Sequence, residues 1–225
     1  MTTLQVRGLW TAVARTIGWV AIGLAAIYAL YALSAAITEI VALAGAAPDA
    51  KPRSAPPIFI VHAISGAVAL ASGALQLKLG RPTSRGRRAL HRAAGRSYVV
   101  SAGITCVGGA LISVVFDVGP VGTLAFIAWS TSWFAATAYA LTHIRRGRVQ
   151  EHRRWAIRSY ALAAVFVTFD FARQALAAAG LPPAVVYPVA IAVCTGAHAA
   201  TAEWWIRTRS PRRSRTPLAY ARGAP

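Results

Sequence analysis

Long apolar stretches alternate with short polar ones along most of the chain. Each stretch has about 20 residues or more, the length that an α-helix needs to cross the hydrocarbon core of a bilayer. The pattern predicts an all-α, polytopic membrane bundle. Its six transmembrane helices are expected at residues 16–43, 58–79, 96–118, 121–144, 155–179 and 185–206. Glycine and proline mark the turns, as in Gly119-Pro120 and Gly180-Leu181-Pro182-Pro183.

The two ends of the chain need separate interpretation. The stretch at 16–43 could be a signal peptide cleaved near Ser34-Ala35-Ala36. It is longer than the apolar region of about 7–15 residues in signal peptides, so a retained helix is favoured. Residues 208–225 are rich in Arg, Pro and Ser, which predicts a disordered basic tail. Residues 1–207 are therefore expected to form one transmembrane domain.

Composition supports a membrane protein and argues against two other classes. The chain is 56% hydrophobic and only 13% charged, whereas soluble domains carry about a quarter charged residues. The net charge of +18 would suit nucleic acid, but the arginines stand in short runs between apolar stretches, so no nucleic-acid partner is expected. Cys106 and Cys194 both lie in apolar stretches, which does not suit a disulfide framework.

The distribution of positive charge predicts an orientation. Of the 24 lysine and arginine residues, all except Lys51, Arg53 and Arg173 fall on one predicted side. The positive-inside rule then places both termini and both basic loops in the cytoplasm. Abundant alanine and the scarcity of lysine suggest a bacterial genome rich in G and C, so a bacterial plasma membrane is expected. Anionic lipid head groups are the expected partners of these loops. Their candidate contact residues are Arg92, Arg96, Arg145, Arg146, Arg153 and Arg158.

Two segments of the chain resemble each other. One runs from His91-Arg92 to Arg96-Ser97-Tyr98, and the other runs from His152-Arg153 to Arg158-Ser159-Tyr160. Each is followed by a long apolar stretch, which suggests a duplicated unit. The helices from 58 to 179 are therefore expected to form two repeated hairpins with basic turns. His91 and His152 would lie at equivalent depths, at the junctions of loop and helix.

Several polar residues fall inside the predicted helices, where charge is costly. Asp170 and Arg173 are three residues apart and form a self-neutralising pair or contact a ligand. His62 begins a stripe of small residues that ends at Gln76, which suits close helix packing or a flat ligand. Together, His62, Gln76, Asp170 and Arg173 are candidates for a polar cleft. A second stripe comprises Trp129, Trp133, Ala136, Ala140 and His143.

Residues 58–175 resemble a family of bacterial predicted membrane proteins, domain-of-unknown-function family 2306. The resemblance implies a membrane fold and no established activity. Asp170 lies outside the pattern, so the resemblance assigns it no role. The matching residues are His62, Ser65, Gly66, Gly73, Gln76, His91, Arg92, Gly95, Arg96, Tyr98, Trp129, Ile144, Arg145, Arg146, Gly147, His152, Arg153, Trp155, Ile157, Arg158, Ser159, Tyr160, Ala161 and Leu162.

Two functions fit these features. The favoured one is a non-catalytic or transporter-like bundle whose basic loops bind lipid head groups. The alternative is a haem b- or quinone-linked electron-transfer protein, loosely similar to cytochrome b561. In this alternative, His91 and His152 would hold the iron, and His62 is a further candidate for a haem ligand. Nearby arginines would pair with the haem propionates. Covalent haem attachment is excluded because no Cys-x-x-Cys-His occurs, and phosphate-loop, zinc-helix and nucleophile-elbow motifs are also missing.

Overall fold

The computed structural model describes residues 37, 57–80, 82–115 and 118–209. Apart from residue 37, the helix predicted at 16–43 lies outside the described residues, as does most of the predicted tail. The described part contains five long helices and no strand, and all five are long and apolar enough to cross a membrane. They are α2 (Pro57–Leu79), α3 (Arg85–Val115), α4 (Pro120–Arg145), α5 (Val149–Ala178) and α6 (Pro183–Arg209).

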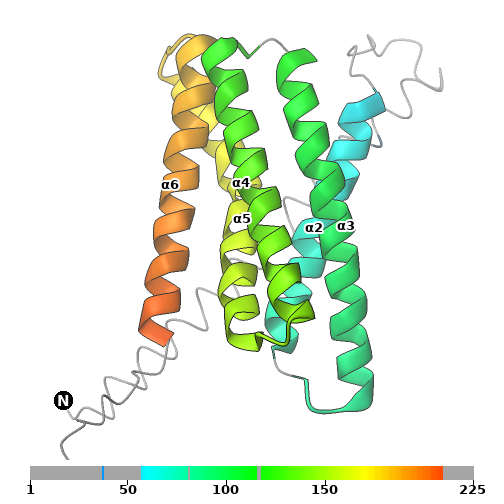
Figure 1. Ribbon diagram of the computed structural model, residues 1–225. Helices are drawn as coiled ribbons and strands as arrows, with labels where there is room; N and C mark the ends of the chain where they lie inside the picture. Colours follow the sequence, from blue (N-terminus) through cyan, green and yellow to red (C-terminus); the bar gives the residue numbers. More distant parts are fainter. Residues whose placement is uncertain (1–36, 38–56, 81, 116–117, 210–225) are drawn as a thin grey trace, which may run out of the picture.

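Successive helices run in opposite directions and pack side by side (Figure 1). The closest neighbours are α2 with α3, α4 with α5, and α5 with α6, while α4 also contacts both α3 and α6. The turns after α2 and α4 and the last turn of α6 therefore lie at one end, drawn at the bottom of Figure 1. We call it the basic end, because it carries the arginine-rich segments.

The described turns between helices are short and stereochemically defined. Each contains a glycine with positive φ, and Gly147 and Gly180, at +70° and +80°, occupy the left-handed region that ends a helix. At the start of α3, the Ser84 hydroxyl accepts a hydrogen bond from the Arg87 amide at 3.3 Å. Ser84 therefore caps this helix, in agreement with its side-chain chemistry.

Two helices extend further at the basic end than hydropathy predicts. Helix α3 begins at Arg85 rather than at residue 96, and α5 begins at Val149 rather than at residue 155. His91 and His152 consequently lie within helices and not at loop–helix junctions. Hydropathy locates the limit of the bilayer, but arginine and alanine are good helix formers, so the helix continues into the polar region.

Aromatic side chains and small residues fill the core. The stripe predicted on α4 faces inward, with Trp129, Trp133, Ala136 and Ala140 at most 7% exposed. The indoles of Trp129 and Trp133 stack with centroids 6.0 Å apart, and the Phe166 ring of α5 packs edge-on against both. The buried core draws side chains from all five described helices.

Candidate functional site

A buried hydrogen-bond network links the three central helices. The Tyr98 hydroxyl of α3 lies 2.7 Å from the Ser159 hydroxyl of α5 and accepts a hydrogen bond from the Trp133 indole at 3.0 Å. Ser159 also lies 2.7 Å from the hydroxyl of Thr137 on α4. These polar groups thus satisfy one another in an apolar environment, where an unpaired group would be costly. The network thus holds α3, α4 and α5 in a fixed register along the axis of the bundle.

Immediately beside this network, Gly73 lets α2 approach the two repeated tyrosines. A Cβ atom at Gly73 would lie 2.4 Å from Cδ2 of Tyr160 and 3.0 Å from Cε2 of Tyr98. The Tyr160 hydroxyl donates to the backbone carbonyl of Leu70 at 3.3 Å, which holds its ring in place. The packing leaves no room for even a methyl group, so the small-residue stripe of α2 serves helix packing here.

His62 and Gln76, predicted to share a cleft, lie at different depths. Nδ1 of His62 donates to the Thr105 carbonyl at 3.0 Å, and its ring contacts Phe166 with centroids 5.2 Å apart. The Gln76 amide lies against Gly95 near the basic end. Fourteen residues of α2 separate His62 from Gln76, which corresponds to about 21 Å. The same distance along α3 separates Thr105 from the level of His91.

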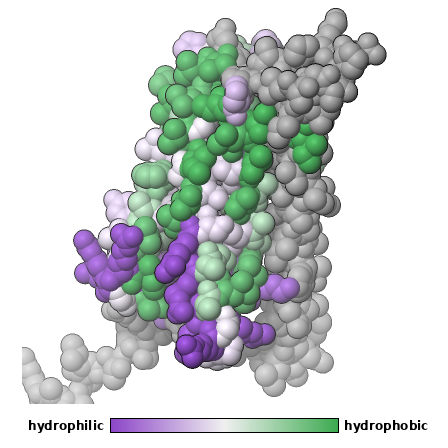
Figure 2. Space-filling view, turned by 90° about the vertical axis from the view of Figure 1, so that its right-hand side faces the viewer, coloured by the Kyte–Doolittle hydropathy of each residue, from purple (hydrophilic) through white to green (hydrophobic). Residues whose placement is uncertain are grey.

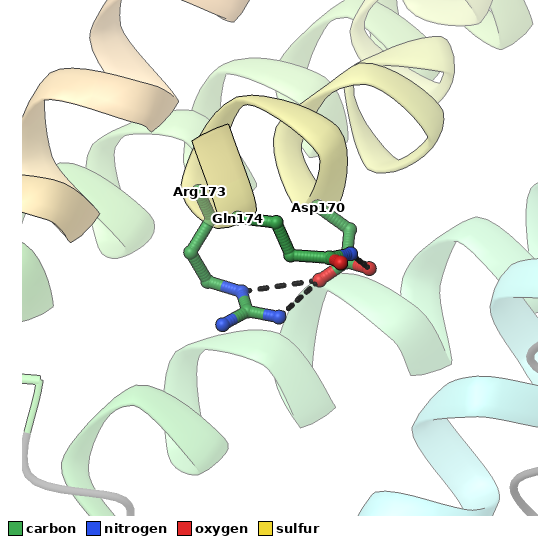
Figure 3. Close-up of polar contacts among 3 residues, drawn as sticks. All are labelled: Asp170, Arg173 and Gln174. Carbon is green, nitrogen blue, oxygen red and sulfur yellow. Dashed lines mark hydrogen bonds and ion pairs between the residues drawn. The ribbon is translucent and has the colours of Figure 1, made fainter. Parts of the chain in front are cut away.

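Asp170 and Arg173 form a compact group with Gln174 on a single stretch of α5 (Figure 3). One oxygen of Asp170, Oδ1, accepts hydrogen bonds from Nε and Nη2 of Arg173 at 3.1 and 2.7 Å. The other oxygen, Oδ2, accepts one from the Gln174 amide at 2.8 Å. The carboxylate is thus satisfied by neighbours on its own helix, which is the geometry of a self-neutralising pair.

At the basic end, some arginines have acidic partners and others do not. Arg158 forms a two-fold ion pair with Glu203 of α6, at 2.5 and 3.2 Å, and its guanidinium covers the Trp155 ring. Arg154 pairs with Glu151 at 2.7 Å. The remaining candidates are exposed and form no ion pair with any residue that the structure describes: Arg92, Arg96, Arg145, Arg146 and Arg153. Figure 2 shows the hydrophilic residues gathered toward this end.

The histidines differ in their surroundings. Nδ1 of His152 donates to the Ala140 carbonyl at 2.9 Å, and His198 is hydrogen bonded to Thr168 at 3.0 Å. Burial lowers the pKa of His91, and the nearby His152 lowers it further, while the equivalent depth of the two histidines stays a prediction. In contrast, Nδ1 of His91 and Nδ1 of His143 are buried and have no hydrogen-bond partner within the described part of the chain.

Two features were not predicted from the sequence. The network of Tyr98, Trp133, Thr137 and Ser159 is one, and the pairing of Arg158 with Glu203 is the other. The repeated Arg-Ser-Tyr sequence was a signal for the first, because both Tyr98 and Ser159 belong to it. No local pattern points to the second, since the two partners are 45 residues apart.

Comparison with known proteins gives one match. A family described as predicted membrane protein (DUF2306) matches residues 59–206, which include nearly all of the described helices. No curated protein and no solved structure matches the chain.

Proposed function

We propose that this chain, which belongs to the DUF2306 family of predicted membrane proteins, is a non-catalytic multi-pass bundle whose basic end binds anionic lipid head groups. The observation that carries the proposal is the exposure of five arginines at one end without acidic partners among the described residues. Such residues attract an anionic membrane surface with about 1 kcal/mol each. The acidic side chains at this end, Glu151 and Glu203, are already paired.

The position of these arginines on helices strengthens the argument. Arg92, Arg96 and Arg153 extend from continuous helices, and Arg145 is the last residue of α4. Their backbones are therefore ordered before a ligand binds, which lowers the entropic cost of binding. A planar guanidinium also donates two parallel hydrogen bonds to phosphate oxygens. The arrangement thus suits phosphate groups in a plane beside the membrane.

The tightly packed centre supports a non-catalytic role over a transporter-like one. Close contact at Gly73 and the satisfied network around Tyr98 join α2, α3, α4 and α5 between the middle of the bundle and its basic end. A route for a solute through this point would require those contacts to separate. We therefore place the function at the basic end rather than in the core.

Neutralising two exposed arginines tests the proposal. Native mass spectrometry of the full chain in detergent would measure the apparent Kd for phosphatidylglycerol. For the Arg145→Gln/Arg146→Gln variant we expect an increase on the order of tenfold or more, since two attractive charges are lost. The increase should shrink at high salt, because surface charges are then screened.

The matched control removes positive charge that already has a partner. Arg154→Gln lies at the same end but breaks the ion pair with Glu151, so its effect on lipid affinity should be clearly smaller. Equal losses in Arg154→Gln and in a single Arg145→Gln variant would show a general charge effect. Unchanged affinity in the double variant would rule out the proposed head-group binding.

An absorption spectrum separates this proposal from the haem alternative. That alternative depends on His91 and His152, because His62 lies about 20 Å further along the bundle. We expect protein purified from haem-supplied cells to lack a Soret band, both air-oxidised and dithionite-reduced. A stoichiometric Soret band with sharp reduced bands, lost in His152→Gln, would replace our proposal with haem b-linked electron transfer.

A further inference from the structure

Three histidines on three helices lie at one depth near the basic end. The hydrogen bonds among Tyr98, Thr137 and Ser159 place α3, α4 and α5 in register. From these residues toward the basic end, His91 and His152 are each seven positions away, and His143 is six positions away. At a rise of 1.5 Å per residue, all three histidines lie about 9–11 Å beyond the network.

The same spacing indicates the direction of the three side chains. Seven residues are close to two full helical turns, so His91 and His152 lie on the helix faces that carry the buried Tyr98 and Ser159. His143 follows the buried Ala140 by three residues, which continues the inward stripe of α4. His152 also donates to the carbonyl of Ala140. We call His91, His143 and His152 the histidine cluster.

Two members of the histidine cluster have polar atoms that call for a ligand. Nδ1 of His91 and Nδ1 of His143 are buried without a partner in the described structure. Buried polar groups are nearly always hydrogen bonded, so each of these nitrogens has a hydrogen-bonding capacity that a bound group could take up. The nearby His152 also lowers the pKa of His91, and an anion beside the His91 ring would oppose this by favouring its protonated form.

The size and charge of the ligand follow from the surroundings. Within the described residues, no three potential metal ligands are close enough to hold one ion. A phosphate group is larger and can accept hydrogen bonds from several imidazole N–H groups at once. Arg92 and Arg145, next to the histidine cluster in sequence, are exposed and add positive charge. The environment therefore suits a phosphate rather than a bare cation.

We propose that the histidine cluster is a specific binding site for the phosphate group of an anionic ligand at the basic end. This phosphate site rests on the proposed function, because the phosphate would come from a lipid head group. The exposed arginines attract the anionic surface, and the histidines hold one phosphate by directed hydrogen bonds. Head-group binding thus gains a defined site, with helices α3, α4 and α5 each contributing one side chain.

Phenylalanine variants test this site without a large change of volume. We expect His91→Phe and His143→Phe to weaken phosphatidic acid binding at least about tenfold in native mass spectrometry, because each removes a hydrogen bond to a charged group. Their unfolding midpoints in lipid-free neutral detergent should stay unchanged or rise, because each substitution removes an orphaned polar atom. A purely structural role for these rings would instead lower the midpoint and leave the affinity unchanged.

The control is His198→Phe, which removes an imidazole that is hydrogen bonded to Thr168 away from the basic end. Its affinity for phosphatidic acid should match that of the unmodified protein. Inorganic phosphate, added at constant ionic strength, distinguishes the source of the ligand. Displacement of the lipid by phosphate would assign the site to free phosphate groups, whereas no displacement would assign it to the head group.

The outcomes separate the two proposals. If Arg145→Gln/Arg146→Gln weakens binding but both phenylalanine variants bind normally, the phosphate site is overturned and head-group binding stands. If none of these variants changes affinity, both proposals fail. A Soret band lost on substitution of His91 would also overturn the phosphate site, because the ring would then ligate iron.

Discussion

Replacing Gly73 by alanine is expected to destabilise the folded protein by about 3 kcal/mol, the upper end of the usual cost of an overpacked core. The new methyl group would overlap the Tyr160 ring, whose Cδ2 and Cε2 atoms would be only 2.4 and 2.6 Å away. That ring cannot move freely, since its hydroxyl is bonded to the Leu70 carbonyl on α2. The new Cβ atom would also lie only 3.0 Å from Cε2 of Tyr98, so α2 cannot shift toward α3 to relieve the overlap.

The same substitution two stripe positions away provides a matched control. At Gly66, a Cβ atom would lie 3.6 Å from Cγ2 of Thr105, an ordinary van der Waals contact. Gly66→Ala should therefore be neutral or stabilise α2 by up to about 1 kcal/mol, because alanine favours helix. Unfolding in mixed micelles with sodium dodecyl sulfate, followed by circular dichroism, would measure the unfolding free energies of both variants. Equal stability of the two variants would contradict the close packing described at Gly73.

Removing Arg173 alone should destabilise the protein more than removing Arg173 together with the charge of Asp170. Arg173→Leu leaves the carboxylate with only the Gln174 amide as a described partner. In Asp170→Asn/Arg173→Leu the negative charge is gone as well. We expect the double variant to be more stable by about 1–2 kcal/mol. This is less than for a fully buried pair, because both side chains are partly exposed.

The comparison of single and double variants isolates the charge effect. Any other contact of Arg173 is lost equally in both, so it cancels in the difference. The measurement is again the unfolding free energy in mixed micelles. Asp170→Asn alone serves as the control for the carboxylate, and its hydrogen bonding to Gln174 can persist. If the double variant is the less stable one, the pair is not simply self-neutralising.

The helix positions were largely predictable, and the reason lies in the turns. Gly119-Pro120 and Gly180 break the chain where hydropathy also falls, so the predicted limits of α4 agree with the structure within a residue. The starts of α3 and α5 were wrong because no proline separates Arg87 from Arg96, or Val149 from Trp155, and the one glycine there, Gly95, does not interrupt α3. A helix can continue there at little cost, although the bilayer has ended.

The contents of the candidate site were less predictable. Periodicity identified the inward faces of α2 and α4, because burial repeats along a single helix. It cannot show which residue on another helix meets Gly73 or His62, since this depends on helix rotation and offset. The distance of Gln76 from His62 was nevertheless calculable from the rise per residue. The grouping of His62 with Gln76 in a polar cleft did not use this separation, and it stays a prediction, as does the pairing of His91 with His152 that the repeat suggested.

The extension of α3 beyond the apolar region has a consequence for how the protein responds to its membrane. Its 31 residues span about 46 Å, whereas the hydrocarbon core of a bilayer is about 30 Å thick. Only the apolar part of a helix has to match the hydrocarbon core, so the polar extension of α3 can stand outside the core without tilting the helix. In a thicker membrane, Arg92 and Arg96 would come level with the head groups, and in a thinner one they would stand in water. If the basic end binds head groups as proposed, the attraction between these arginines and the membrane would depend on bilayer thickness as well as on lipid charge.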